Sequence, residues 1–106
     1  MIRAQLIRSG DHIVGFKIKG HAEYAEHGQD IVCAAASFLA ITVENSLELQ
    51  LHREGTTTMK SGELFYRLPD GLTEDELRQA QIILQVLDTG FRNLEKEYPN
   101  YVQYRS

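Results

Sequence analysis

The side chains that could do chemistry lie in one short stretch, which holds a histidine, an aspartate and the only cysteine of the chain. Cys33 follows His21 by twelve positions and Asp30 by three. Asp30 is a favourable N-cap for the apolar segment that begins at Ile31, so Cys33 falls in the first turn of a predicted helix. Backbone N–H groups of a first turn are unpaired and the helix dipole is positive there, which favours a thiolate. The same N–H groups could hold the oxyanion of an acyl-transfer reaction.

His21 could supply a base for that thiol. It lies where a predicted strand ends and a loop begins, so it approaches Cys33 if the helix packs on the sheet. A neutral imidazole could then take the thiol proton and return it to the leaving amine. Asp30 either orients His21 or only caps the helix, and a carboxylate near Cys33 would also oppose thiolate formation. The spacing leaves these roles open.

Other interpretations of these residues involve no catalysis. A free cysteine between Val32 and Ala34 is commonly an inert core residue, and a histidine after a strand is commonly a packing group. The protein would then be an interaction module with Cys33 in its core. The even spacing of His21, His27 and Cys33 admits a metal site, but it matches no standard zinc pattern. We therefore expect no metal and no cofactor.

The composition limits the class of protein further. A chain of 106 residues is long enough for one domain, spanning residues 1–106. Its formal net charge of −4 disfavours a direct nucleic-acid partner. One cysteine cannot form an internal disulfide. No uninterrupted apolar run reaches the roughly 18 residues of a membrane helix, and the first residues alternate like a strand rather than a signal peptide. We expect a cytoplasmic protein with no membrane partner.

Alternation of apolar and polar residues predicts the strands. It runs over residues 2–6 and 14–18, with turn residues between them, which indicates an antiparallel hairpin. A second hairpin is predicted from residues 56–59 and 64–68, again around a glycine-containing turn. Residues 20–30 fit no period, so they are predicted to form a loop with a glycine near each end.

The first predicted helix runs from Ile31 to about His52 and ends at Gly55. Its core-facing residues recur at spacings of three and four: Val32, Ala36, Leu39, Val43 and Leu47. The first half of this helix is apolar nearly all round, which indicates burial on more than one side. In so small a chain, a second subunit could supply part of that cover.

The second predicted helix has the clearest end signals. Thr73 and Glu76 match the capping box, and Pro99 stops the helix. One face stays apolar from Leu77 to Tyr98, and residues 101–104 could add a short edge strand. The expected fold class is α+β. It is a two-layer sandwich in which two long helices cover one face of an antiparallel β-sheet, in the order β-β-α-β-β-α with an optional final β.

The chemistry-bearing stretch resembles the signature of a known family, the Prp family of ribosomal-processing cysteine proteases (YsxB-like proteins). The resemblance covers about a quarter of the chain, and its motif is specific because histidine, glycine, aspartate, cysteine and serine all fall in place together. It rests on Gly20-His21-Ala22, Gly28, Asp30-Ile31-Val32-Cys33-Ala34-Ala35 and Ser37. One departure is Ala36, where the family often has a larger aliphatic residue, so the pocket near Cys33 is expected to be slightly larger.

The resemblance implies an activity and a set of roles. Cys33 would be the nucleophile and His21 the general base of a cysteine endopeptidase. Asp30 and Ser37 would support the active site, and glycines 20 and 28 would give its loop mobility. Family members are small homodimers that remove an N-terminal extension from ribosomal large-subunit protein twenty-seven, after a pair of aromatic residues. The alternative is a non-catalytic module in ribosome assembly.

Overall fold

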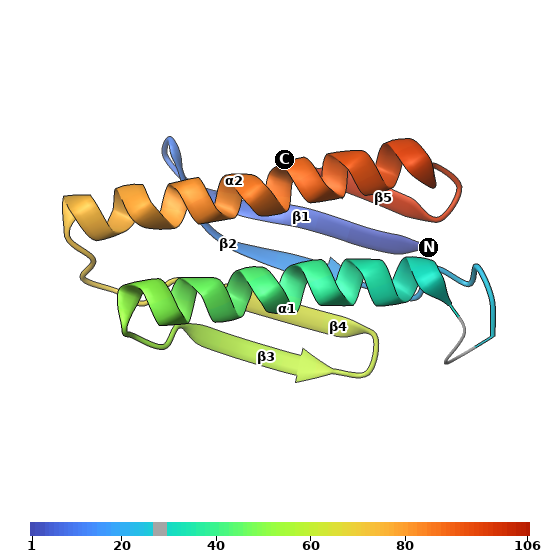
Figure 1. Ribbon diagram of the computed structural model, residues 1–106, viewed down its shortest axis with the longest axis horizontal. Helices are drawn as coiled ribbons and strands as arrows, with labels where there is room; N and C mark the ends of the chain where they lie inside the picture. Colours follow the sequence, from blue (N-terminus) through green and yellow to red (C-terminus); the bar gives the residue numbers. More distant parts are fainter. Residues whose placement is uncertain (27–29) are drawn as a thin grey trace.

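Two long helices lie side by side on one face of a five-stranded sheet in the computed structural model of the chain (Figure 1), which describes residues 1–26 and 30–106. This arrangement confirms the expected α+β sandwich. The elements are β1 (Ile2–Ser9), β2 (His12–Lys19), α1 (Ile31–Leu51), β3 (Thr56–Lys60), β4 (Glu63–Arg67), α2 (Glu74–Glu97) and β5 (Val102–Arg105). The final edge strand, optional in the sequence, is therefore present.

The strand order is β3-β4-β2-β1-β5. Both hairpins are antiparallel, as predicted, but β5 pairs in parallel with β1. The expectation of a wholly antiparallel sheet is therefore wrong at this edge. The reason is that α2 carries the chain back along the sheet, so β5 runs in the same direction as β4, and β4 already runs in the direction of β1. The sheet is mixed.

The core lies between the sheet and the helices. Alternate strand residues such as Ile2, Ala4 and Phe16 point toward the helices and are buried. From the other side, α2 buries four residues on one face: Ala80, Leu84, Leu87 and Phe91. The rings of Phe16 and Tyr66 stack at 5.5 Å between centroids in the middle of this layer. Apolar residues recur every second position in the strands and about every 3.6 positions in α2. The faces that these patterns predict to be buried are the ones that pack together.

Local signals place most element ends, with two corrections. The capping box of Thr73 and Glu76 is formed at the start of α2. The first helix covers its predicted range to about His52, but Gly55 does not stop it: α1 ends at Leu51, and His52 adopts the left-handed conformation with φ 55°. The turn between β3 and β4 is also shorter than predicted, because β4 begins at Glu63 and leaves only Ser61 and Gly62 in the turn.

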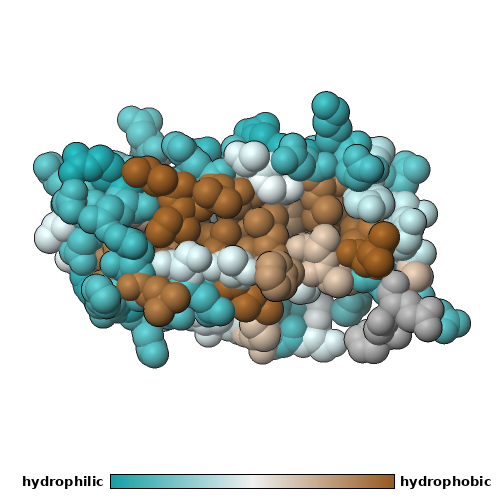
Figure 2. Space-filling view, viewed as in Figure 1, coloured by the Kyte–Doolittle hydropathy of each residue, from teal (hydrophilic) through white to brown (hydrophobic). Residues whose placement is uncertain are grey.

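The helix α1 is apolar on average, although polar residues interrupt its apolar runs. By length and mean hydropathy alone it could cross a membrane, which corrects the expectation that no segment could. A core helix passes the same test, and α1 buries Val32, Ala40 and Val43 against the sheet. Figure 2 shows, however, that an apolar band remains exposed over the two helices. It includes Phe38, whose side chain is 76% exposed.

Candidate active site

The site is built around the start of α1, which Asp30 caps. One carboxylate oxygen of Asp30 accepts the backbone N–H groups of Val32 and Cys33, both at 3.0 Å. The other oxygen accepts the N–H groups of Tyr24, at 2.9 Å, and Ala25, at 3.4 Å. Burial raises the pKa of Asp30, but these four hydrogen bonds outweigh it and hold the pKa below its ordinary value. The carboxylate is therefore ionised and joins the loop to the helix.

These bonds decide the roles that the sequence left open for Asp30. It caps the helix, and among the described residues it makes no hydrogen bond to His21. They also correct the expectation that free N–H groups of the first turn hold an oxyanion. Val32 and Cys33 donate to Asp30, and Ala34 donates to the carbonyl oxygen of Asp30. A side-chain cap satisfies these donors before any ligand arrives.

Tyr24 gives the loop a second attachment. Its ring meets the rings of Tyr98 and Tyr101 edge-on, at 5.7 and 5.1 Å between centroids. Tyr98 follows α2 and Tyr101 precedes β5, so this cluster joins the loop to the connection between α2 and β5. Edge-to-face aromatic contacts are favourable beyond their buried area. The loop before α1 is thus held by Asp30 at one point and by aromatic packing at another.

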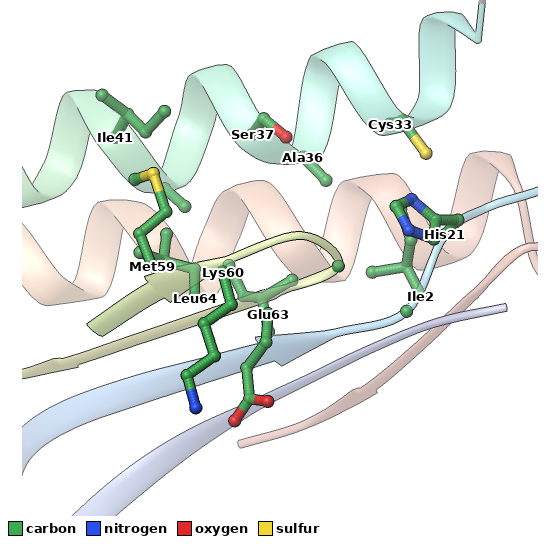
Figure 3. A pocket seen from close by; sticks show the side chains of 14 residues that line it. Ile2, His21, Cys33, Ala36, Ser37, Ile41, Met59, Lys60, Glu63 and Leu64 are labelled. Atoms are coloured by element: carbon green, nitrogen blue, oxygen red, sulfur yellow. The ribbon is translucent and has the colours of Figure 1, made fainter. Parts of the chain in front are cut away.

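Cys33 lies at the edge of the core and also lines a hollow. It is a free, half-buried cysteine, and its Sγ accepts the backbone N–H of Ala22 at 3.1 Å. His21 is the neighbour of Ala22, and the side chains of His21 and Cys33 line the same two hollows. Figure 3 shows both side chains at one end of the first hollow, with the imidazole of His21 next to the sulfur of Cys33. No hydrogen bond joins imidazole and sulfur among the residues that the structure describes.

Two close backbone approaches hold His21. The N–H of Gly20 donates to the carbonyl of Gly62 at 2.8 Å, and the amino group of Met1 donates to the carbonyl of His21 at 2.6 Å. Gly20 has φ +90°, and a Cβ there would lie 2.3 Å from the carbonyl oxygen of Met1. A Cβ on Gly62 would lie 2.9 Å from Nε2 of His21. Position 20 therefore requires glycine for space as well as for conformation, whereas a side chain at position 62 would displace the imidazole of His21.

A groove of about 200 Å³ leads from this pair along α1 and the β3–β4 hairpin. Its helix side carries Ser37, one turn after Cys33, with Ala36 and Ala40 beneath (Figure 3). Its remaining walls come from Ile2, Ile18, Ile41, Met59, Gly62 and Leu64. Ala36 is 2% exposed, so the small side chain predicted to enlarge the pocket does lie in its floor. The groove is open and mainly apolar, which suits an extended peptide with apolar side chains.

The structure brings most of the predicted site residues together. Gly20, His21, Cys33 and Ser37 line the groove, and Asp30 lies beneath the helix start. Gly28 and His27 fall outside the described residues, so the role predicted for Gly28 stays a prediction. In the described part of the chain, no three histidine, cysteine or acidic side chains gather closely enough to hold a metal ion.

The sequence did not predict that the β3–β4 turn contributes to the site. Gly62 and Met59 lie about thirty to forty positions after His21, and the sequence indicated only a hairpin there. A glycine in a turn is expected for conformational reasons alone. No local signal could place it against an imidazole, because that contact depends on β4 pairing with β2.

A thiol at a helix start, a histidine beside it and a peptide-sized groove define a site of the cysteine protease class. Residues 1–103 match the sequence pattern of the family described as "Cysteine protease Prp". A Bacillus subtilis (strain 168) relative, the "Ribosomal processing cysteine protease Prp", is 29% identical over 101 residues, covering 92% of this chain and 90% of that protein. The protein of that name from Staphylococcus aureus (strain Mu50 / ATCC 700699) is 34% identical over 80 residues, covering 74% of this chain and 73% of the relative. The chain belongs to the Prp family of cysteine proteases.

Solved structures agree with this assignment. A Staphylococcus aureus Prp described as an essential ribosomal processing protease, in complex with a covalently linked product peptide, has a TM-score of 0.84 and 26% identity. That comparison covers 99% of this chain and 98% of the other. A Streptococcus mutans protein has a TM-score of 0.81 at 28% identity, covering 99% and 92% of the two chains. Both likenesses extend over nearly the whole of this chain.

Proposed function

We propose that Cys33 and His21 form a catalytic dyad that cleaves the N-terminal extension of a ribosomal large-subunit protein, protein twenty-seven. The observation that carries this proposal is their shared position at one end of a peptide-sized groove. Cys33 is half-buried and lines both hollows, which a core cysteine would not do. The relatives named for ribosomal processing, and the solved relative with a covalently linked product peptide, support this substrate class.

The proposed reaction begins when His21 takes the proton of the Cys33 thiol. The thiolate attacks the scissile carbonyl carbon, and the resulting tetrahedral intermediate collapses as imidazolium gives its proton to the leaving amine. A thioester then joins Cys33 to the N-terminal fragment. Water, deprotonated by the same imidazole, attacks the thioester carbonyl and releases the carboxylic acid and the free thiol. The helix dipole at the start of α1 favours the negative sulfur.

A change at Cys33 is required before attack. In this structure the sulfur accepts the N–H of Ala22, and no described hydrogen bond connects it to the imidazole. A small rotation of either side chain suffices, because both already face the same hollow (Figure 3). Active-site contacts of this kind commonly tighten only when substrate is present. The Ala22 N–H keeps the sulfur at the mouth of the groove until then.

Mass spectrometry of an extended ribosomal protein incubated with the enzyme tests the proposal. Wild type should release the extension, whereas Cys33→Ala and His21→Ala should each leave the protein uncut while keeping a cooperative thermal transition. Thr42→Ala is a matched control, because Thr42 is exposed on the same helix and lines neither hollow, and it should cleave at the wild-type rate. Cleavage by Cys33→Ala at the wild-type rate would contradict the proposal. Slow reaction of Cys33 with iodoacetamide in the folded protein would instead favour the non-catalytic module.

We also propose a homodimer that covers the exposed apolar residues of the two helices. The helix patch is defined as Phe38, Leu39, Ile82 and Val86. Leu39 of α1 lines one shallow hollow with Ile82 and Val86 of α2, and Phe38 is its exposed neighbour on α1. Figure 2 shows an apolar band over these two helices. Ile82 is 61% and Val86 58% exposed in the single chain. Exposed apolar areas of this kind commonly mark subunit contacts. The resemblance of the sequence to a homodimeric family supports the same arrangement.

Light scattering at micromolar concentration tests this dimer. Phe38→Ser should shift the mass toward that of the monomer. Leu49→Ser is a matched control, because Leu49 is also 76% exposed on α1 but lies eleven residues away and outside the helix patch. Monomeric wild type would contradict the dimer. We further propose that the enzyme acts in the cytoplasm, where the thiol of Cys33 stays reduced, and cell fractionation with an antibody would check this location.

A further inference from the structure

The charges of this chain are separated between its two layers. The five strands carry seven of the eleven lysines and arginines but only one of the fifteen acidic residues, Glu63. The two helices carry eight acidic residues and three basic ones. A net charge of −4 therefore averages an acidic helix layer and a basic sheet layer. The overall charge does not describe either surface.

The strand registers place six of these cations on the outer face of the sheet, away from the helices. Residues that alternate with the buried ones point outward, so Ile2, Ala4 and Phe16 face the core while their neighbours face solvent. We call this outward surface the basic face, and its cations are Arg3, Lys17, Lys19, Lys60, Arg67 and Arg105. Figure 3 shows Lys60 and Glu63 pointing away from the helices. Glu63 also lies on this face, so six cations and one carboxylate give the basic face a net charge of +5.

These cations are only partly neutralised within the chain. Glu63 lies directly opposite Lys19 on β2 and Lys60 on β3, so one carboxylate faces two of the six cations. The ion pairs found in the described part of the chain use Arg53, Arg78 and Arg92, none of which lies on the basic face. Arg3 is also directly opposite Lys19, which places like charges together and costs stability. A surface that keeps this cost and a large surplus of cations is suited to a negatively charged partner.

One aromatic side chain narrows the choice of partner. Phe65 lies on the basic face, opposite Lys17 on β2 and Thr58 on β3. Its ring is only half-buried. Nucleic-acid bases stack on aromatic rings while cations hold the phosphates, and a sheet face with both elements is a recurrent way of holding single-stranded RNA. An acidic peptide would use the cations but has no need of the ring.

We propose that the basic face binds single-stranded RNA, with Phe65 stacking on a base and the surrounding lysines and arginines contacting phosphates. This replaces, for this one surface, the expectation from net charge that the chain has no direct nucleic-acid partner. The face lies on the opposite side of the sheet from α1 and meets the groove only at its edge, where Lys60 and Glu63 border both surfaces. RNA binding does not depend on the proposed protease substrate.

Fluorescence anisotropy with a labelled oligouridylate of about 12 nucleotides tests the proposal. Wild type and Cys33→Ala should bind equally, with affinity falling steeply as salt rises from about 50 to 200 mM. Lys17→Gln/Lys19→Gln should weaken binding about tenfold and reduce the salt slope by about 1.4, since each single-strand phosphate contact contributes about 0.7. Phe65→Leu should weaken binding at least about fivefold through lost stacking.

The matched control is Arg78→Gln/Lys96→Gln, which removes the same charge from α2. It should leave RNA affinity within about twofold of wild type. Equal loss in both double variants would show a general charge effect and overturn the proposal. So would binding of a polyglutamate peptide as tight as that of the RNA, which would make the face a site for acidic protein. Thermal melts and peptide cleavage should be unchanged in Lys17→Gln/Lys19→Gln. If that double variant fails to fold, the single variant Phe65→Leu still tests RNA binding.

Discussion

The start of α1 and the start of α2 lie at opposite ends of the molecule and use the same devices (Figure 1). Each helix is capped by a side-chain oxygen, from Asp30 in one case and Thr73 in the other. Each end also has a two-residue hairpin turn with a left-handed glycine, Gly62 beside α1 and Gly10 at the far end. The two ends differ in which residues these caps and turns hold in place.

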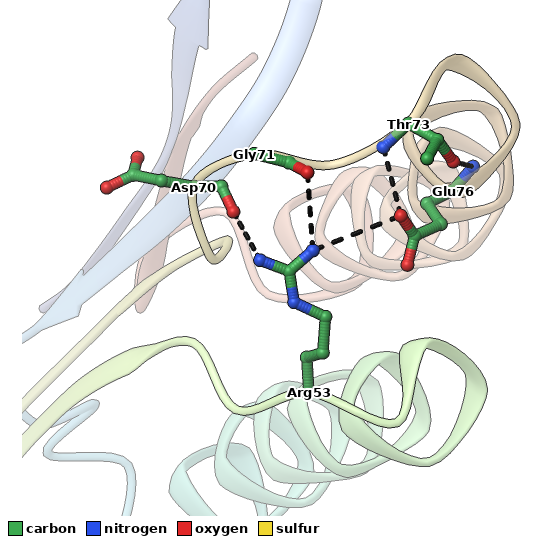
Figure 4. A network of polar contacts seen from close by, with 5 residues as sticks. All are labelled: Arg53, Asp70, Gly71, Thr73 and Glu76. Carbon is green, nitrogen blue, oxygen red and sulfur yellow. Dashed lines mark hydrogen bonds and ion pairs between the residues drawn. The ribbon is translucent and has the colours of Figure 1, made fainter.

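At the α2 end the polar groups satisfy one another. Thr73 and Glu76 exchange hydrogen bonds, and Arg53 donates to the carbonyls of Asp70 and Gly71 and pairs with Glu76 at 3.9 Å (Figure 4). These contacts join the end of α1 to the start of α2. Arg53 also borders a hollow with Leu49 and His52, but the only cysteine of the chain lies at the other end, so we assign these contacts to stability. The capping box is the clearest case, because both of its hydrogen bonds are local.

At the α1 end, contacts of the same kinds place the side chains of His21 and Cys33 around a hollow. Asp30 ties two segments together, Gly20 and Gly62 allow the chain to pass close to His21, and Ala22 donates to the sulfur of Cys33. The comparison teaches that a cap or a turn glycine cannot be assigned to stability or to catalysis by its local form. The assignment depends on what lies beside it.

The largest expected difference between the ends comes from removing the two caps. Asp30→Ala should lower peptide cleavage at least about hundredfold, because misplacement of the helix start and loop by about an ångström has effects of that size. It should also reduce the free energy of unfolding by about 2 kcal/mol. Thr73→Ala should cost about 1 kcal/mol and leave cleavage unchanged. Urea unfolding and a peptide assay measure both effects, and equal activity losses would break the comparison.

A second test compares the two turn glycines. Gly62→Ala and Gly10→Ala both place a Cβ on a left-handed residue, which costs about 1 to 2 kcal/mol. Only the Cβ at position 62 meets the imidazole of His21; nothing lies within 4 Å of a Cβ at position 10. Cleavage should therefore fall about tenfold in Gly62→Ala and stay near wild type in Gly10→Ala. Inactive Gly10→Ala would show that strain alone, at any turn, disables the enzyme.

Acid should weaken both helix starts, the α2 end because hydrogen bonds with Thr73 lower the pKa of Glu76, and the α1 end through Asp30. The pKa of Asp30 is lowered in the folded state by four backbone hydrogen bonds that outweigh burial, so its stabilising contribution is complete above the unfolded value near 3.8. That contribution is lost as pH falls through the lower folded pKa. Urea unfolding between about pH 6 and 3 should show a decline that is smaller in Asp30→Asn, which has no carboxylate to protonate. Parallel curves would show that Asp30 does not supply the acid-sensitive stability.

The smallest expected effect lies in the core between the ends. The hydroxyl of Tyr66 is buried without a hydrogen-bond partner in the described structure, and burial together with Glu48 and Glu44 raises its pKa to about 12. Stability from the neutral phenol is thus complete below pH 10 and lost as pH rises toward 12. Tyr66→Phe should raise the free energy of unfolding by about 1 kcal/mol and flatten this alkaline decline. Thermal melts in this range measure it, and destabilisation would reveal a partner for the hydroxyl.

Much of the fold follows from the sequence because its signals are local. The capping box at Thr73, the cap at Asp30 and the alternation in β1 each depend on residues within a few positions of one another. The same holds for the motif around His21 and Cys33, whose residue types and order indicated a thiol protease. Predictions that required longer range were weaker. His52, for example, ends α1 although a glycine three residues later carried the stronger local signal.

The sequence by itself determined the two helices, the two hairpins and the cap at Asp30, and it singled out Cys33 as the proposed nucleophile, since backbone preferences and side-chain periods act over one or two turns. Only the tertiary structure decided the parallel pairing of β5, the place of Gly62 against His21, and the use of Asp30 to hold residues 24 and 25. It also gathered six cations on one sheet face in a chain of net negative charge. Strand pairing joins residues far apart in the chain, and the free energy that selects it comes from burial of the whole core rather than from any single segment.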